Sequence, residues 1–168
     1  MRTFHWGAST IAALLFAVPV FAQAPAPVPE AMANYIPIGA PISLDQAKKV
    51  AAAAEAEARK HNWKMAIAIV EPTGDLIYFE KIDDTQYSSI RVAQSKARSA
   101  AIYRRPTKAF FDVIESGHSY VMTLDGMSGA EGGMPIVAGG KIIGAIGVGG
   151  GSAAQDGLVA NAGAESVK

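Results

Sequence analysis

The chain contains no cysteine among its 168 residues. This absence excludes disulfide bonds, thiolate metal sites, cysteine nucleophiles and covalent haem attachment at a Cys-x-x-Cys-His motif. Long hydrophobic runs are scarce too, because the clearest one, residues 11–21, is too short to span a bilayer. Histidine occurs only three times, and the isolated His61 and His118 do not form the ligand cluster of a zinc site.

The sequence also lacks an excess of charge of either sign. It has 15 Lys and Arg residues against 15 Asp and Glu residues, and no basic block. A near-neutral chain of this kind is not typical of nucleic-acid-binding proteins. Walker loops, HExxH, GxSxG and EF-hand motifs are absent as well, so none of the common catalytic signatures assigns a reaction.

The N-terminal segment has the features of an export signal. Arg2 and His5 form a short basic start, residues 11–21 are apolar, and Ala-Gln-Ala at 22–24 resembles a cleavage site. We therefore expect residues 1–24 to be a signal peptide, with an uncleaved membrane anchor as the alternative. The expected location is the bacterial periplasm or the medium. After cleavage, no long apolar run remains to interact with a membrane.

The rest of the chain is divided by composition. Residues 25–42 are rich in Pro and Ala and predict an extended leader. Residues 43–168 predict one domain, with helices expected at 43–59, 88–104, 107–116 and from 152 onward. The expected strands are at 64–70, 76–82, 119–124, 134–138 and 141–148. Because hairpins outnumber possible βαβ crossovers, this order predicts an α+β fold with a five-stranded antiparallel sheet and flanking helices.

A glycine-rich stretch at residues 132–156 is the most distinctive part of the sequence. Gly139-Gly140 separates two apolar runs, which indicates a hairpin with a primed turn. Gly149 and Gly150 then lead to Ser152, where Ser-x-x-Gln indicates a capped helix start. Such a start offers free N–H groups to an anion. The alternative is that the glycines only let elements pack closely.

Several side chains could bind a cofactor. His118 or Tyr120 could ligate a haem iron, although His118 could instead simply cap the preceding helix. Lys96, Arg98 and Arg105, together with Arg104, could receive carboxylates or haem propionates, although a solvated helix face is the alternative. The candidates for moving a proton in an enzyme are Lys96, Glu131 and Asp156.

Taken together, these residues resemble the GlcG/HbpS-like family, also called the haem-degrading domain family. The resemblance covers residue 44 to the C-terminus. It is carried by Val-Glu-Pro-Thr-Gly-Asp-Leu at 70–76, Lys-Ile-Asp-Asp-Thr at 81–85, Gly-Gly-Met-Pro-Ile-Val at 132–137 and Ile-Gly-Ala-Ile-Gly-Val at 143–148. Lys81 and Gly149 stand where the family usually has Arg and Ser.

The resemblance implies a profilin-like fold, homo-oligomers and, in some members, the binding of haem or the release of its iron. Our leading hypothesis is therefore an exported, oligomeric haem-binding or haem-handling protein. In this hypothesis the ligand candidates are His118 and Tyr120. The alternative is a cofactor-free isomerase or tautomerase, or a binding protein, for a small carboxylated metabolite held near Gly149, Gly150 and Ser152.

Overall fold

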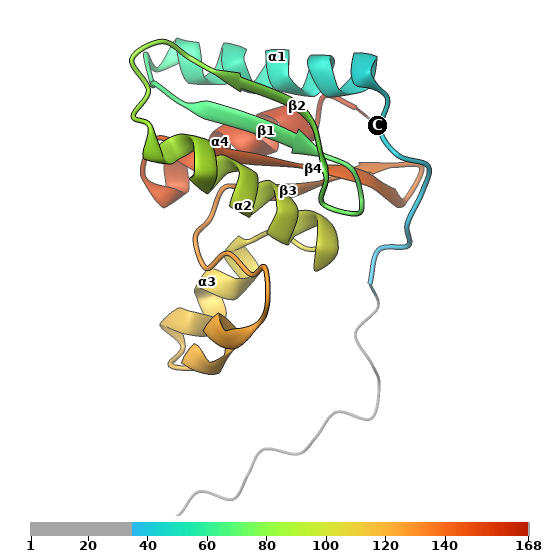
Figure 1. The fold of residues 1–168 in the computed structure, drawn as a ribbon, viewed down its shortest axis with the longest axis vertical. Helices are drawn as coiled ribbons and strands as arrows, with labels where there is room; N and C mark the ends of the chain where they lie inside the picture. The colour runs from blue at the N-terminus through green and yellow to red at the C-terminus, as the bar shows by residue number, and fades with distance from the viewer. Residues whose placement is uncertain (1–34, 168) are drawn as a thin grey trace, which may run out of the picture. The chain divides into compact units, whose positions relative to one another are not determined.

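The computed structural model describes residues 35–167, so the expected signal peptide and residues 25–34 of the expected leader lie outside the described residues. The elements follow the order α1 (Leu44–Lys60), β1 (Ala66–Val70), β2 (Leu76–Lys81), α2 (Ser88–Ile102), α3 (Lys108–Glu115), the 3-10 helix η1 (Ser119–Thr123), β3 (Gly133–Ala138), β4 (Lys141–Gly149) and α4 (Ala153–Ala164) (Figure 1).

The sheet has four strands in the order β2-β1-β4-β3, and all three neighbouring pairs are antiparallel. The prediction of five strands was wrong, because residues 119–123 form η1 instead of a strand. In η1 Val121 is buried while Tyr120 and Met122 are exposed. A segment with one buried apolar side chain and no neighbouring strand lacks both the face and the hydrogen-bond partners that stabilise a strand.

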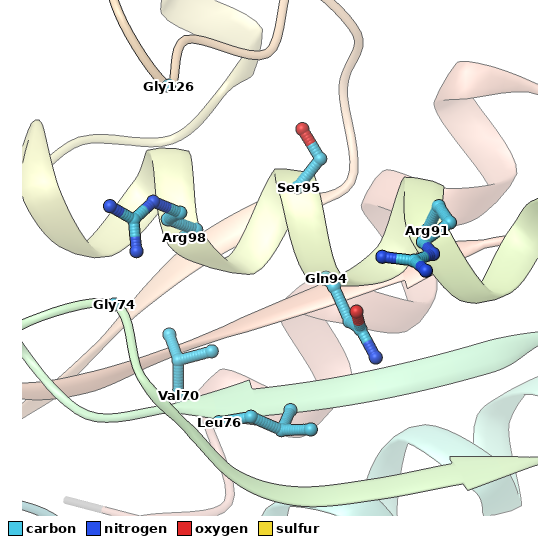
Figure 2. A pocket seen from close by; sticks show the side chains of 8 residues that line it. All are labelled: Val70, Gly74, Leu76, Arg91, Gln94, Ser95, Arg98 and Gly126. Atoms are coloured by element: carbon cyan, nitrogen blue, oxygen red, sulfur yellow. The ribbon is translucent and has the colours of Figure 1, made fainter.

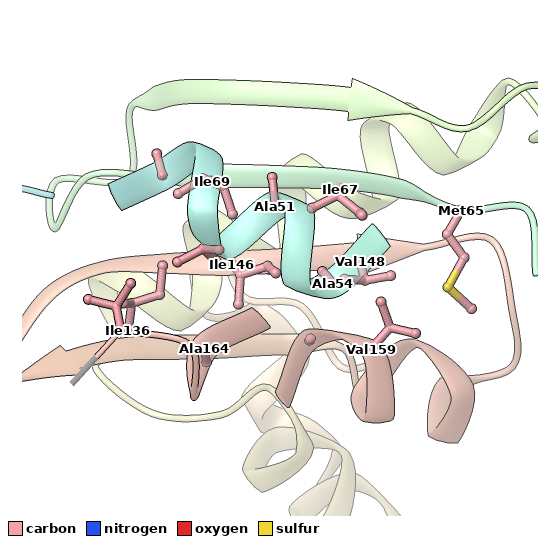
Figure 3. Close-up of a cluster of buried hydrophobic side chains, with 14 of the residues drawn as sticks. Ala51, Ala54, Met65, Ile67, Ile69, Ile136, Ile146, Val148, Val159 and Ala164 are labelled. Atoms are coloured by element: carbon pink, nitrogen blue, oxygen red, sulfur yellow. The ribbon is translucent and has the colours of Figure 1, made fainter. Parts of the chain in front are cut away.

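Helices cover both faces of the sheet (Figure 1). Helices α1 and α4 pack on one face and enclose the larger core, to which β1 and β4 contribute alternate Ile and Val side chains (Figure 3). Helix α2 packs on the other face through an almost pure alanine cluster. Alternation along a strand sends successive side chains to opposite faces, which is why Ile67 and Ala68 of β1 belong to different clusters.

Local sequence signals set the element boundaries. Ser43 and Ser152 are the N-caps of α1 and α4, and both helices have the reciprocal hydrogen bonds of a capping box. Gly139 and Gly140 form the β3–β4 turn with φ values of +55° and +73°, as a primed hairpin turn requires. Gly117 follows α3 with φ of +90°. The predicted helix starts at Ser43 and Ser152 and the predicted primed turn are confirmed.

The alanine cluster lets α2 lie very close to the sheet. A methyl group added at Gly147 of β4 would overlap the backbone of Ala93 and Ala97 on α2. At Gly147, the alternative interpretation that the glycines of residues 132–156 let elements pack closely therefore holds. The tight contact fixes where the residues of α2 stand relative to β4 and to the loop that follows it.

Part of the Pro-rich segment contacts the sheet. Residue Ile38 forms a parallel bridge with Ile142, the Gly39 N–H donates to the Ile142 carbonyl at 2.8 Å, and the Ile42 side chain is buried. Residues 35–42 thus run beside the start of β4. None of the helices that the structure describes is long and apolar enough to cross a membrane.

Candidate functional site

A buried ion pair joins two elements that are distant in sequence. The Nζ atom of Lys96 on α2 lies 2.6 Å from Oδ2 of Asp156 on α4, and both residues are almost fully buried, with exposed fractions of 2% and 3%. The backbone N–H of Gly151 donates to the other carboxylate oxygen at 2.9 Å. The alternative interpretation of the basic residues as a solvated helix face is therefore wrong for Lys96.

The position of Lys96 follows from helix geometry. Ala93 and Ala97 pack against the sheet, and Lys96 lies between them toward the β4–α4 loop. Burial raises the pKa of the Asp156 carboxyl, and the hydrogen bonds from Lys96 and Gly151 oppose that rise. Burying an ion pair to this degree destabilises the folded state unless the remaining hydrogen-bond donors and acceptors of the two side chains are satisfied.

A cavity of about 250 Å³ opens beside this ion pair, and we call it the Lys96 cavity. Helix α2, the β4–α4 loop and the first residue of α4 line it. Its lining residues are Gln86, Ser88, Ser89, Val92, Lys96, Ala130, Gly150, Gly151, Ala153 and Asp156. Ser89 is 1% exposed, and its hydroxyl has no hydrogen-bond partner among the described residues. Two of the predicted proton-moving residues, Lys96 and Asp156, are thus brought together here.

The other residues predicted around the glycine loop take different roles. Gly150 lines the Lys96 cavity with φ of +141°, whereas Gly149 ends β4 against α2. The Ser152 hydroxyl accepts a hydrogen bond from the Gln155 N–H as the N-cap of α4. Glu131 lies against α4 at Gly157 and does not line the cavity.

A second cavity, of about 320 Å³, lies between α3, η1 and the N-terminal segment, and we call it the α3–η1 cavity. Its lining is mainly aromatic and aliphatic. The residues are Tyr35, Tyr103, Arg105, Ala109, Phe110, Val113, Tyr120, Val121 and Leu124. The Arg105 guanidinium lies over the rings of Tyr35 and Phe110, at 5.2 Å and 5.6 Å from their centroids. One cation thus makes cation–π contacts with two aromatic rings.

His118 stands next to the α3–η1 cavity without lining it. Its ring meets the ring of Tyr120 edge to face, with centroids 6.2 Å apart. Nδ1 of His118 lies 2.9 Å from the Ser116 hydroxyl, which orients the ring and leaves Nε2 for another partner. Tyr120, Met122 and Leu124 are exposed beside it, at 67%, 64% and 40%. An exposed apolar group of this kind is typical of a binding surface.

The predicted basic patch is not one surface. Arg105 lines the α3–η1 cavity, but Arg98 lines a third cavity of about 380 Å³ together with Arg91, Gln94 and Ser95. Figure 2 shows these side chains projecting from α2 above the β1–β2 hairpin. Arg104 instead donates to the Ile36 carbonyl at 3.3 Å. The structure thus distributes Lys96, Arg98 and Arg105 over three cavities.

Sequence reasoning missed several lining residues. Ser89 is one residue of a Ser-Ser pair at a helix start, which usually suggests capping. Tyr35 lies in the Pro-rich segment, and Phe110 is a buried aromatic residue of α3 that no motif marks as a ligand contact. The described residues contain no group of three or more His, Asp or Glu side chains that could hold a metal ion.

Comparison with known proteins agrees with this architecture. The family model described as haem degrading protein HbpS-like matches residues 42–165. The GlcG protein of Escherichia coli K12 is 38% identical over 107 residues, covering 64% of this chain and 80% of GlcG. A double mutant of HbpS from Streptomyces reticuli has a TM-score of 0.70 and 27% identity, covering 86% of this chain and 99% of that one.

A further solved structure shares the fold at lower sequence identity. PduOC, solved as a complex with haem, has a TM-score of 0.70 and 23% identity, covering 76% of this chain and 96% of that one. The family match spans most of the chain and nearly all of the described domain. The chain is therefore a member of the HbpS-like family of haem-degrading proteins.

Proposed function

We propose that this protein binds and handles haem at the α3–η1 cavity, with His118 or Tyr120 as the iron ligand. Haem presents a flat apolar ring, two propionate carboxylates and an iron that accepts His or Tyr. The cavity offers aromatic side chains for the ring and one guanidinium, Arg105, for a propionate. His118 stands at its edge with one nitrogen already oriented.

The observation that carries this proposal is the grouping of His118, Tyr120 and Arg105 around one apolar cavity. The family supports it, because its description names haem degradation. The PduOC complex shows that the fold can hold haem. Haem, when bound, would supply the iron, while the chain's own residues would hold the ring, pair with a propionate and ligate the iron.

Export and assembly belong to the same proposal. Residues 1–24 have the signature of a signal peptide, and they lie outside the described residues. Exposed apolar side chains at η1 and at Leu76 of the edge strand β2 offer surfaces for a second copy of the chain. We infer an exported homo-oligomer that acts on haem in the periplasm or the medium.

Hemin titration tests the haem site directly. The purified protein should show a saturable shift of the Soret band, and His118→Ala should abolish or displace it. If Tyr120 is the ligand, Tyr120→Ala should have that effect instead. Arg105→Gln should weaken hemin binding by roughly ten-fold, because a charge-assisted hydrogen bond contributes about 1.5–3 kcal/mol.

The control is His61→Ala. His61 is an exposed histidine at the C-cap of α1, stacked on Trp63 and far from any cavity described above. Its loss should leave the titration unchanged. A Soret shift that persists unaltered in the double variant His118→Ala, Tyr120→Ala would refute the ligand assignment. The absence of any saturable shift in the native protein would refute haem binding itself.

A further inference from the structure

The Lys96 cavity contains more hydrogen-bond donors than the described residues satisfy. A lysine ammonium has three N–H donors. Within residues 35–167, the only hydrogen bond that the Lys96 ammonium makes goes to the Asp156 carboxylate. The buried Ser89 hydroxyl has no partner in the same part of the chain. Unsatisfied buried polar groups are costly, so a pair of them facing one cavity indicates that something else satisfies them.

The start of α4 borders the same cavity. The N–H groups of Gly151, Ser152 and Gln155 are satisfied by side chains of α4 and its cap. Ala153 lines the cavity, and its N–H donates to no acceptor among the described residues. A helix N-terminus carries about half a positive charge. The N-terminus of α4 therefore adds a further N–H donor to those of Lys96 and Ser89, from a different helix.

The balance of charge limits the ligand. Lys96 and Asp156 neutralise each other, which leaves the partial charge of the helix terminus as the net field in the cavity. A single negative charge is favoured there, whereas the Asp156 carboxylate would repel a dianion. A cation is disfavoured because Lys96 and the N-terminus of α4 would repel it. The unsatisfied groups are donors, so the ligand must present acceptors.

The size of the cavity limits the ligand further. A volume of about 250 Å³ corresponds to about eight water molecules at 30 Å³ each. Val92, Ala130 and Ala153 give part of the wall an apolar surface. We propose that the Lys96 cavity is a binding site for a small monocarboxylate, whose carboxylate meets Lys96, Ser89 and the N-terminus of α4. This site is separate from the α3–η1 cavity and does not rest on haem binding.

Ser89→Ala is the decisive variant because it removes an unpaired hydroxyl and leaves the Lys96–Asp156 pair intact. The unliganded variant should be as stable as the native protein or more stable. Its affinity for a monocarboxylate should fall roughly ten-fold, because hydrogen bonds to charged groups contribute about 1.5–3 kcal/mol. Ser95→Ala is the matched control, since Ser95 lies on the same helix and lines a different cavity.

The full chain would be titrated with sodium acetate, lactate and butyrate, with sodium chloride at equal ionic strength as the blank. Binding would be followed by thermal unfolding and by backbone amide chemical shifts. We expect a saturable rise in melting temperature in at least one series, with shifts concentrated at Gly150, Gly151 and Ala153. Lys96→Gln should abolish both effects, and its stability without ligand should be measured in parallel.

Three outcomes would overturn the proposal. One is the absence of saturable binding by all three acids, and another is equal affinity in Ser89→Ala and Ser95→Ala. The third is a preference for inorganic phosphate, which would show that a dianion is the better ligand. Hemin titration of Ser89→Ala separates the two sites, because the Soret response should be unchanged even where carboxylate binding is lost.

Discussion

Glu80 lies on the edge strand β2 with its Oε1 atom buried and without a hydrogen-bond partner among the described residues. The Tyr78 hydroxyl donates to the other oxygen at 3.2 Å. Burial raises the pKa of the Glu80 carboxyl, and repulsion from Glu55 of α1 raises it further. The folded protein therefore holds this proton more tightly than the unfolded chain does.

This residue makes stability depend on pH. Because the pKa is raised in the folded state, the contribution of Glu80 is favourable below the unfolded value near 4.5 and is lost as pH rises through the folded value. Glu80→Gln removes the charge, so it should raise the free energy of unfolding at pH 7 and change it little at pH 4. Urea denaturation at both pH values measures this.

Glu71→Gln is the control for that experiment, because Glu71 lies in the turn of the same hairpin. Comparison with this variant shows how much of the change in Glu80→Gln comes merely from removing one carboxylate from the hairpin. If Glu80→Gln destabilises the protein at pH 7 as much as at pH 4, the carboxylate contributes through a contact, and the argument from its pKa is wrong.

The residues of α2 show what a single sequence can and cannot predict at this scale. Ala93, Ala97 and Ala101 recur at helical spacing and are all buried. For Lys96 the sequence left open whether it binds a ligand, moves a proton or belongs to a solvated helix face, because lysine is rarely buried without a partner. Its partner, Asp156, lies 60 positions further along the chain. No local pattern connects the two residues, so the ion pair could not be predicted.

At the scale of elements, the contact between α2 and β4 leaves no room for a side chain at Gly147. Gly147→Ala places a methyl group against the backbone of α2 at Ala93 and Ala97. Backbone atoms cannot move aside as a flexible side chain can, so the helix must shift. Overpacked cores lose about 1–3 kcal/mol and sometimes more. We expect a loss of at least about 3 kcal/mol in urea denaturation.

Gly139→Asn provides the comparison for that variant. Gly139 lies in the β3–β4 turn with φ of +55°, and nothing is within contact distance of an added Cβ atom. Asn tolerates this left-handed conformation better than most residues. The expected change is below about 1 kcal/mol. Equal stability of the two variants would show that α2 has room to move, contrary to the packing described above.

Helix caps and turns were predicted correctly because interactions within a few residues determine them. Features that depend on contacts with distant segments were predicted wrongly. The caps at Ser43 and Ser152 and the turn at Gly139 depend on hydrogen bonds and backbone angles within a few residues. The segment at 119–124 was expected to be a strand but forms η1, because no neighbouring strand is available to it. Thr107 was expected to cap α3. Its hydroxyl instead accepts a hydrogen bond from the Gly133 N–H at 2.9 Å.

At the scale of the whole molecule, export predicts a specific N-terminus. Cleavage after Ala24 would leave 144 of the 168 residues. N-terminal sequencing of the protein recovered from a bacterial periplasm should begin at Pro25, and light scattering should give a multiple of the mass of one chain. Ala24→Leu should block processing, because the cleavage site needs a small residue. Recovery of a monomer that begins at Met1 would contradict both parts of this proposal.

The sequence by itself determined the α+β class, the cap and turn positions and the family, because these follow from periodicity, local hydrogen bonding and ordered motifs. The tertiary structure decided the number of strands, the burial of Lys96 against Asp156 and the division of the basic residues among three cavities. These features depend on contacts between segments far apart in the chain. Such contacts arise only when α2 and α4 are packed against the same sheet.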